Sequence, residues 1–187
     1  MGILTEKYAD IIEGTLARYP DNRSAVLPLM HLAQEEYGYM SQEAVTEVAE
    51  ILHLDPTHVQ SLAGFYSLYY EDPVGRYVLE ICTDLACALR GADEFAEMAC
   101  NKLGVGFDEI TSDGLFTIKH VMCLGACDRA PMLQCNLKFE ENLDEAKFDA
   151  LVDRLRQQAE NGDAAPSVVQ RISAYARSVQ PLEQVEE

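Results

Sequence analysis

The sequence of 187 residues predicts an α+β protein in which a helical bundle precedes a smaller domain built from strands and helices. Three observations support this fold class. Apolar residues recur at helical spacing through residues 1–72. Short apolar runs typical of strands begin only after the turn-forming stretch EDPVG at residues 71–75. From there, the order of strand, helix, strands and helix is typical of a compact α/β or α+β domain.

Residues 1–72 are expected to form four helices, and the short links between them favour an antiparallel bundle. Thr5 is expected to cap the first helix, which ends at Pro20 because proline cannot continue a helix. The second helix begins near Ser24 and ends at Gly38, since glycine adopts the left-handed conformation of a C-terminal cap without strain.

The third and fourth helices have clear N-terminal signals. Ser41 precedes the third helix as a capping residue. Asp55 followed by Pro56 combines a capping side chain with a favoured first helical residue, and so begins the fourth helix. The aromatic residues of these helices, Phe65 among them, are expected to lie in the core.

Residues 73–160 are predicted to form the second domain, followed by a tail over residues 161–187 with a weak helix at 168–179. Leu89 and Phe95 are expected to lie on the apolar side of this domain's first helix. The expected elements are a strand at 76–82, a helix at 87–103, a strand at 115–121, short strands at 131–136 and 137–140, and a helix at 144–158.

The net charge of the chain limits the kinds of partner that it can bind. It contains 32 acidic and 14 basic residues, which gives a formal charge of −18 at pH 7, and residues 1–72 hold half of it. Nucleic acids and anionic membrane surfaces need basic patches, so neither is expected as the main partner. The sequence has no signal peptide and no apolar run long enough to cross a membrane. A cytoplasmic location is therefore expected, where thiols stay reduced and clustered cysteines more often hold metal.

Four of the six cysteines form two tight pairs. Cys82 and Cys87 are separated by four residues, and Cys123 and Cys127 by three. Each pair lies where a predicted strand runs into a loop, which is the usual place for site residues on a rigid scaffold. Cys87 is expected at a helix N-terminus, where the helix dipole would stabilise its thiolate. Gly125 allows the chain to turn sharply within the second pair.

This spacing favours a [2Fe–2S] cluster and leaves other chemistries open. Such a cluster takes four thiolates, two on each iron. Zinc ribbons prefer cysteines separated by two residues, so a zinc-stabilised interaction module is a second interpretation. A dithiol oxidoreductase is a third, against which the missing C-x-x-C counts, and chance pairs or disulfides complete the set. The spacing of plant-type ferredoxins and the interleaved histidines of a Rieske centre are both absent.

The stretches around both cysteine pairs carry a resemblance to a known family. PVGRYVLEICTDLACALRGADE at 73–94 and DGLFTIKHVMCLGACDRAPMLQCN at 113–136 closely resemble the thioredoxin-like [2Fe–2S] subunit of NADH:quinone oxidoreductase (respiratory complex I). LPLMHLAQEEYGYMS at 27–41 and GFYSLYYEDPVGRY at 64–77 look like that family's N-terminal helical region. The resemblance covers roughly residues 24–155.

The resemblance implies a specific site and role. Cys82, Cys87, Cys123 and Cys127 would bind one [2Fe–2S] cluster on a thioredoxin-like domain that follows a helical bundle. The cluster would exchange electrons with FMN on a partner subunit that also binds NADH, and this chain would have no catalytic residues of its own. The sequence contains no G-x-G-x-x-G and no Walker motif, in agreement with nucleotide chemistry on a partner. Through the complex, the chain would be peripheral on the cytoplasmic side of the membrane.

The resemblance also allows a second electron-transfer role for the chain. Related subunits occur in NAD-reducing hydrogenases and NAD-dependent formate dehydrogenases, so the chain could be the equivalent subunit of either. Three positions depart from the resemblance: Ala86 stands where many relatives have proline, and Asp128 and Arg129 follow the fourth cysteine where less charged residues are expected. Because an oxidised four-thiolate cluster is already anionic and the chain carries −18, a low reduction potential is expected.

Several residues near the pairs have two interpretations each. Arg90 follows Cys87 by about one helical turn and either faces the anionic cluster or lies in solvent. Pro131 is either a cis proline near the cluster or a proline at a strand edge. Cys100 and Cys135 are expected to be small buried apolar residues. The histidines lie singly in the sequence and none is expected to bind metal: His31, His53, His58 and His120.

Overall fold

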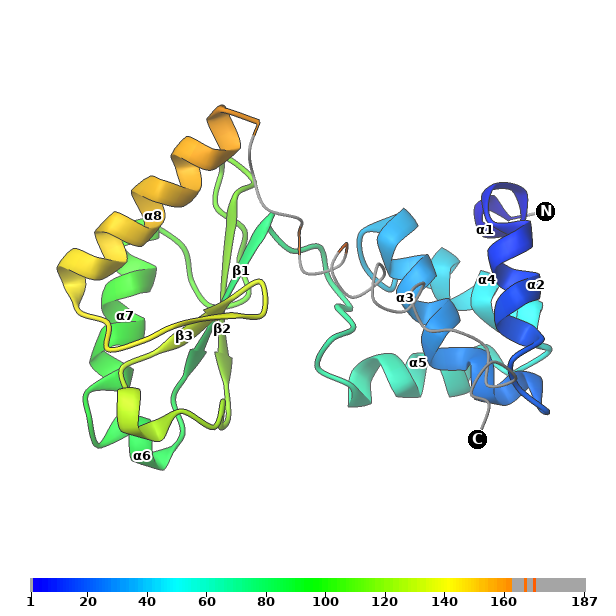
Figure 1. Ribbon diagram of the computed structural model, residues 1–187, viewed down its shortest axis with the longest axis horizontal. Helices are drawn as coiled ribbons and strands as arrows, with labels where there is room; N and C mark the ends of the chain where they lie inside the picture. Colours follow the sequence, from blue (N-terminus) through cyan, green and yellow to red (C-terminus); the bar gives the residue numbers. More distant parts are fainter. Residues whose placement is uncertain (1, 163–166, 168–169, 171–187) are drawn as a thin grey trace, which may run out of the picture. The chain divides into compact units, whose positions relative to one another are not determined.

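The computed structural model describes residues 2–162, 167 and 170 (Figure 1). Two compact units meet in the chain between Pro73 and Val74. The first unit is helical and the second combines a sheet with helices, so the predicted α+β class is confirmed. The weak helix expected at 168–179 lies outside the described residues apart from Gln170.

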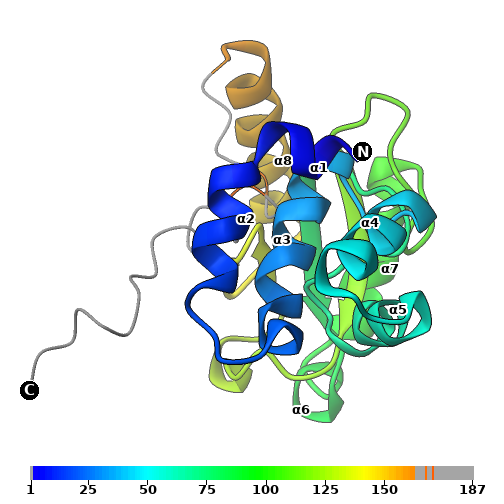
Figure 2. The same ribbon diagram turned by 90° about the vertical axis from the view of Figure 1, so that its right-hand side faces the viewer.

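The first unit consists of helices packed around one core (Figure 2). α3 packs on α4, and α4 packs on α5. Leu29, Val45 and Val59 are among the fully buried residues that these three helices contribute. The elements are α1 (Ile3–Lys7), α2 (Ala9–Leu16), the 3-10 helix η1 (Asn22–Ala25), α3 (Val26–Tyr37), α4 (Gln42–Leu52) and α5 (Pro56–Phe65).

Three of the expected helix-end signals are confirmed. The hydroxyl of Ser41 accepts the backbone N–H of Ala44 at 3.2 Å and so caps α4. The carboxylate of Asp55 accepts the backbone N–H of Thr57 at 2.7 Å at the start of α5. Gly38 ends α3 in the left-handed conformation, with φ at 85°.

The start of the chain differs from the prediction. The first expected helix is two helices, because Tyr8 leaves helical geometry with φ at −127° and ψ at 25°. Thr5 is not a cap, since it lies inside α1. The capping group comes from α4 instead, where Glu47 Oε1 accepts the backbone N–H groups of Leu4 at 2.9 Å and Thr5 at 3.2 Å. The expected burial of Phe65 is also wrong: this side chain, the last residue of α5, is 77% exposed.

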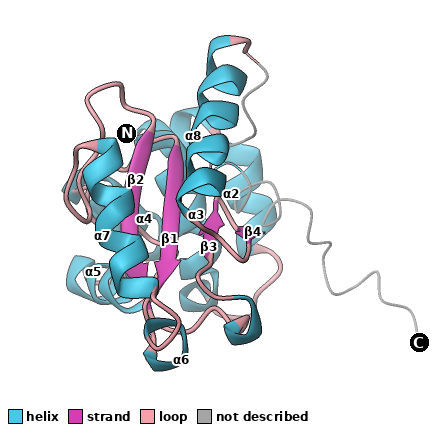
Figure 3. Cartoon of the chain, turned by 90° about the vertical axis from the view of Figure 1, so that its left-hand side faces the viewer, coloured by secondary structure: helices cyan, strands magenta, loops and turns pink. Residues whose placement is uncertain are grey.

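The second unit is built on a mixed sheet of four strands in the order β2-β1-β3-β4 (Figure 3). β1 pairs in parallel with β2 and antiparallel with β3, and β3 and β4 form an antiparallel pair. Tyr77, Leu79 and Ile81 alternate along β1 and share one core with residues of α7 and α8, so both helices cover the same face. The main elements are β1 (Tyr77–Cys82), α6 (Leu85–Ala88), α7 (Ala92–Leu103), β2 (Phe116–Val121), β3 (Leu133–Cys135), β4 (Lys138–Glu140) and α8 (Glu145–Glu160).

The helix expected at 87–103 is interrupted. Gly91 has φ at 86°, a left-handed conformation that separates the short α6 from α7. As a consequence, Leu89 does not lie on the apolar side of a continuous helix, and it is 81% exposed. Phe95, beyond the interruption, is buried as expected.

Candidate functional site

The two cysteine pairs follow neighbouring parallel strands. Cys82 is the last residue of β1, and Cys87 lies in α6. Cys123 comes shortly after β2, and Cys127 begins the 3-10 helix η2 (Cys127–Arg129). Because β1 and β2 are parallel and Cys82 is in register with Val121, both loops leave the same edge of the sheet. The topology therefore brings the two pairs together.

The second pair has the separation of two ligands on one metal ion. The Sγ atoms of Cys123 and Cys127 are 4.0 Å apart. Two thiolates on a tetrahedral ion, with metal–sulfur bonds of about 2.3 Å, lie about 3.8 Å apart. Gly125 makes the turn between them with φ at 76°, and its backbone N–H donates to Cys123 Sγ at 3.4 Å. The loop thus already holds one hydrogen-bond donor against a sulfur.

The first pair is buried and touches the second loop. Both Cys82 and Cys87 are fully buried, whereas Cys123 is exposed and Cys127 half-buried. The Cys82 thiol donates to the carbonyl oxygen of Met122 at 2.9 Å. Cys82, Cys127 and Cys123 all lie close enough to Cys87 to raise the pKa of its thiol. All four sulfurs therefore belong to one electrostatically connected group.

Two thiols of this group, those of Cys87 and Cys127, have a pKa above the ordinary value for cysteine. Burial raises the pKa of Cys87 to about 12, and the hydrogen bond with Cys82 adds to this effect. The pKa of Cys127 is also raised, first by its hydrogen bond with Cys123. The expected stabilisation of a Cys87 thiolate by a helix dipole is wrong, because α6 has only 4 residues and burial dominates. A bound metal ion reverses this balance, since it deprotonates the thiols that coordinate it.

Arg90 joins the loop of the first pair to the loop of the second. Its Nε donates to the carbonyl oxygen of Ala130 at 3.1 Å. Ala130 packs with Cys82 and Cys87 in a small buried cluster. The side chain of Arg90 is exposed, yet it is held to a loop that lies against the first cysteine pair. Of the two interpretations of Pro131, the cis form is confirmed for the Ala130–Pro131 bond.

The charged residues after the fourth cysteine form a surface ion pair. Arg129 binds Glu141 through Nη1, with distances of 2.9 and 2.7 Å to its two carboxylate oxygens. Asp128 lies 3.5 Å from Arg129 Nε. The backbone carbonyl of Arg129 also accepts the N–H of Asn142 at 2.8 Å. These contacts tie the second loop to the segment that follows β4.

The remaining cysteines lie in the core of the second unit. Cys135 is buried in β3, and Cys100 is half-buried against the same core. This placement confirms that Cys135 is a buried apolar residue and shows Cys100 to be only partly so. Among the histidines, His31 belongs to the first unit, whereas His120 stacks on Phe107 with ring centroids 3.8 Å apart.

The donor set fits a cluster of two irons. Within the residues that the structure describes, no three His, Cys, Asp or Glu side chains converge to hold one metal ion. A [2Fe–2S] cluster takes two thiolates on each iron, and the chain presents two cysteine pairs at one sheet edge.

Exposed apolar side chains border the cysteine loops, and the sequence patterns did not single them out. Leu85 and Leu89, which belong to and follow α6, are 73% and 81% exposed, and Met122 beside Cys123 is 78% exposed. Scattered exposed leucines are common, but three apolar side chains around one site suggest an interaction surface. The apolar periodicity predicts one long helix with Leu89 on its buried side, so the exposure of these leucines was not predicted. Gly91, which can interrupt a helix, is the signal in the sequence that could have indicated it.

No helix in the described part of the chain is long and apolar enough to cross a bilayer.

Comparison with known proteins gives a consistent result. Residues 12–156 match the model of the thioredoxin-like [2Fe–2S] ferredoxin family. The chain is 41% identical over 145 residues to an NADH-quinone oxidoreductase subunit of Rhizobium meliloti, and the match covers 78% of this chain and 86% of the relative. It is 39% identical over 159 residues to NADH-quinone oxidoreductase subunit 2 of Thermus thermophilus, and this match covers 83% of this chain and 87% of the relative.

Solved structures share the fold at lower sequence identity. A chain of an NAD⁺-reducing [NiFe]-hydrogenase in the air-oxidised state superposes with a TM-score of 0.60 at 22% identity. The match covers 70% of this chain and 23% of the hydrogenase chain, so it concerns the fold of one part of a larger protein. The family match, in contrast, spans most of this chain and includes both cysteine pairs. The chain therefore belongs to the thioredoxin-like [2Fe–2S] ferredoxin family.

Proposed function

We propose that the chain is an electron-transfer subunit of an NADH:quinone oxidoreductase and that Cys82, Cys87, Cys123 and Cys127 bind its [2Fe–2S] cluster. The observation that carries the proposal is the meeting of both cysteine pairs at one edge of the sheet. The 41% identity to a subunit of such a complex supports the assignment of the complex. When bound, the cluster supplies one-electron transfer without a covalent bond to a substrate.

The residues of this chain position the cluster and control its surroundings. Cys82 and Cys87 supply ligands from inside the protein, where water has little access. Cys123 supplies a ligand at the surface, and the Gly125 N–H donates to its sulfur. Such donors to sulfur, together with burial, adjust the reduction potential. No general acid, base or nucleophile on this chain is required.

The partner in this proposal is a subunit that binds FMN and NADH, as the resemblance implies. Electron transfer needs that partner close to the exposed side of the site, where Leu85, Leu89 and Met122 project into solvent. Exposed apolar side chains of this size are typical anchors of a protein interface. Through this partner the chain would be held on the cytoplasmic side of the membrane without entering it.

The two parts of the chain have separate roles in the proposal. Residues 73–160 form the thioredoxin-like cluster domain, residues 1–72 form a helical domain, and residues 161–187 form a tail. The cluster ligands, the glycine that turns between them and the exposed leucines all belong to the cluster domain. The helical domain is therefore free to serve assembly rather than electron transfer.

A hydrogenase or formate dehydrogenase subunit is the alternative within the same chemistry. The similarity to the NAD⁺-reducing hydrogenase is at the level of fold, with 22% identity. The two relatives at 41% and 39% identity are both named as NADH-quinone oxidoreductase subunits. The higher identity favours the quinone-linked complex.

The test is a metal and spectroscopic analysis of the full chain purified without oxygen. We expect two iron and two sulfide per chain, a red-brown colour, and a low-temperature paramagnetic signal after dithionite reduction. Cys123→Ser should lose or strongly alter this signal, whereas Cys100→Ser should retain it. A colourless protein that contains zinc instead would support an interaction module and overturn the proposal.

A further inference from the structure

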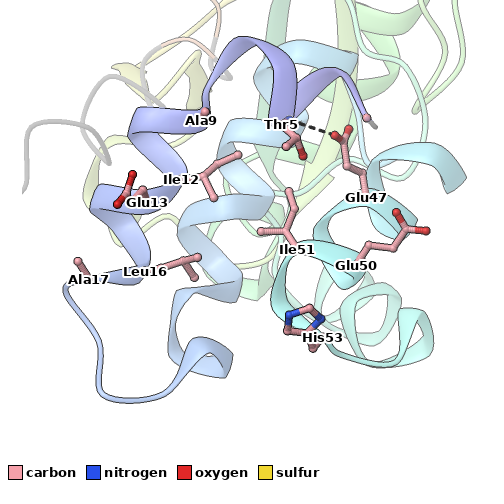
Figure 4. A pocket seen from close by; sticks show the side chains of 11 residues that line it. Thr5, Ala9, Ile12, Glu13, Leu16, Ala17, Glu47, Glu50, Ile51 and His53 are labelled. Atoms are coloured by element: carbon pink, nitrogen blue, oxygen red, sulfur yellow. Dashed lines mark hydrogen bonds between the residues drawn. The ribbon is translucent and has the colours of Figure 1, made fainter.

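The helical unit contains a cavity of about 650 Å³ that the proposed electron transfer does not use (Figure 4). It lies between α2 and α4, with Ile12 and Leu16 pointing from α2 toward Ile51 of α4. These three side chains give it an apolar floor. The cavity therefore has the character of a docking groove.

Carboxylates border this groove on both sides. Glu13 lies on α2 and Glu50 on α4, and both are exposed. Neither forms an ion pair with another residue of the described chain. Glu47, the third acid of the lining, is already bonded to Leu4 and to the hydroxyl of Tyr37. The groove thus offers an apolar floor with two available negative charges.

The tail of the same chain has the complementary pattern. Residues 164–182 contain two arginines, Arg171 and Arg177, and no acidic residue, although the chain as a whole carries −18. Apolar residues recur there at intervals of four, three and four, which places them on one stripe of a helix. The members of this stripe are Val168, Ile172, Tyr175 and Val179.

We propose that residues 168–179 bind in this groove of their own chain as an amphipathic helix. The apolar stripe would cover Ile12, Leu16 and Ile51. Arg171, beside the apolar stripe, would lie near the carboxylates of Glu13 and Glu50, whereas Arg177, on the opposite side of the helix, would face away from the groove. Two features carry the proposal, a groove with unpaired acids and a segment that is basic in an acidic chain. The binding mode is that of an apolar helix face in a hydrophobic groove.

The test is hydrogen exchange of the full chain, with variants in the tail so that the helical unit itself is unchanged. We expect the amides of residues 170–178 to exchange at least about tenfold more slowly in the native chain than in Ile172→Asp. Ser173→Asp adds the same charge away from the apolar stripe and should retain most of the protection. In carbene footprinting, the peptides carrying Leu16 and Ile51 should become more reactive in Ile172→Asp only.

Charge and stoichiometry complete the test. The double variant Glu13→Lys, Glu50→Lys should reduce tail protection, whereas Glu6→Lys, an exposed acid outside the groove, should not. Fast exchange of residues 170–178 in the native chain would overturn the proposal. Protection that disappears on dilution would also overturn it, because the tail would then occupy the groove of a second copy.

Discussion

The guanidinium of Arg90 donates a hydrogen bond of 3.1 Å to the carbonyl oxygen of Ala130. This bond joins the segment after the second cysteine of the first pair to the segment after the last cysteine of the second pair. Because Ala130 packs with Cys82 and Cys87, this bond holds Arg90 to a segment that lies against the first cysteine pair. Arg90 thus connects the two halves of the site.

Arg90→Gln should lower the reduction potential of the cluster. Removal of a positive charge near an anionic centre disfavours the added electron, and a Coulomb interaction of about 1 kcal/mol corresponds to about 40 mV for one electron. A redox titration followed by paramagnetic resonance measures the shift. Arg90→Lys keeps the charge and should shift the midpoint less. An unchanged midpoint in Arg90→Gln would place this charge too far from the cluster to act on it.

Replacement of Glu47 should destabilise the helical unit. Its carboxylate accepts two backbone N–H groups at the start of α1 and the hydroxyl of Tyr37, and Glu47→Gln exchanges one acceptor for a donor. Loss of such buried partners costs about 1–3 kcal/mol. Urea unfolding followed by the helical circular dichroism signal measures this change. The control is Glu50→Gln, at an exposed position on the same helix, which should leave the midpoint nearly unchanged.

Gly2 offers an independent check of the same contact. A Cβ atom at this position would lie 1.9 Å from Glu47 Oε1, so Gly2→Ala must displace either the chain start or the carboxylate. We expect α1 amides to exchange faster in this variant, as in Glu47→Gln. Gly14→Ala is the matched control, since a Cβ there has no atom within 4 Å. Equal exchange in Gly2→Ala and Gly14→Ala would contradict the expected displacement.

The stability of the helical unit should fall in mild acid. Burial lowers the pKa of His31 to about 4 from 6.5, and its buried Nδ1 has no hydrogen-bond partner. Since the unfolded chain binds the proton more readily, stability is full above pH 6.5 and decreases as the pH falls toward 4. With allowance for solvent around a half-buried ring, the loss should be about 2 kcal/mol. His31→Phe should flatten this pH dependence, and His53→Asn should not.

Leu89→Asp should weaken binding of the flavin- and NADH-binding subunit without loss of the cluster. An aspartate in the centre of an apolar contact leaves a buried unpaired charge, so affinity should fall by about tenfold or more. Binding of the two purified subunits, measured by interferometry, reports this change. Phe139→Asp replaces another partly exposed apolar residue, on β4, and serves as the control. Similar losses in both variants would show that Leu89 is not part of the interface.

The sequence was sufficient to predict three of the helix ends and the strands, because their signals are local. Ser41, Asp55 and Gly38 act at the positions that their side chains or conformations favour. Two helix interruptions were not predicted, because no local signal in the apolar pattern marks them. At Tyr8 and Gly91 the apolar periodicity continues past the break, so the pattern alone predicts one helix where the chain forms two.

The pairing of the four cysteines can be recognised in the sequence, whereas the environment of each cysteine cannot. Cysteine spacing identifies the two pairs, and strand order brings them together, but neither determines which sulfurs are buried. The exposure of Leu89 depends on the bend at Gly91, and the capping of α1 depends on Glu47, more than 40 residues away. Such features arise from tertiary packing, which a single sequence does not specify by local pattern.

The unequal exposure of the two cysteine pairs also predicts an order in which the four cysteines would bind iron. Cys123 is open to an iron donor, whereas Cys87 is buried and its pKa is raised to about 12. In the proposed cluster site, the outer loop would therefore be the first to meet incoming iron, and the inner thiols would release their protons on binding it. Loading should consequently acidify an unbuffered solution and slow at low pH. In this order of events, the exposed loop would admit the cofactor and the buried end of β1 would retain it.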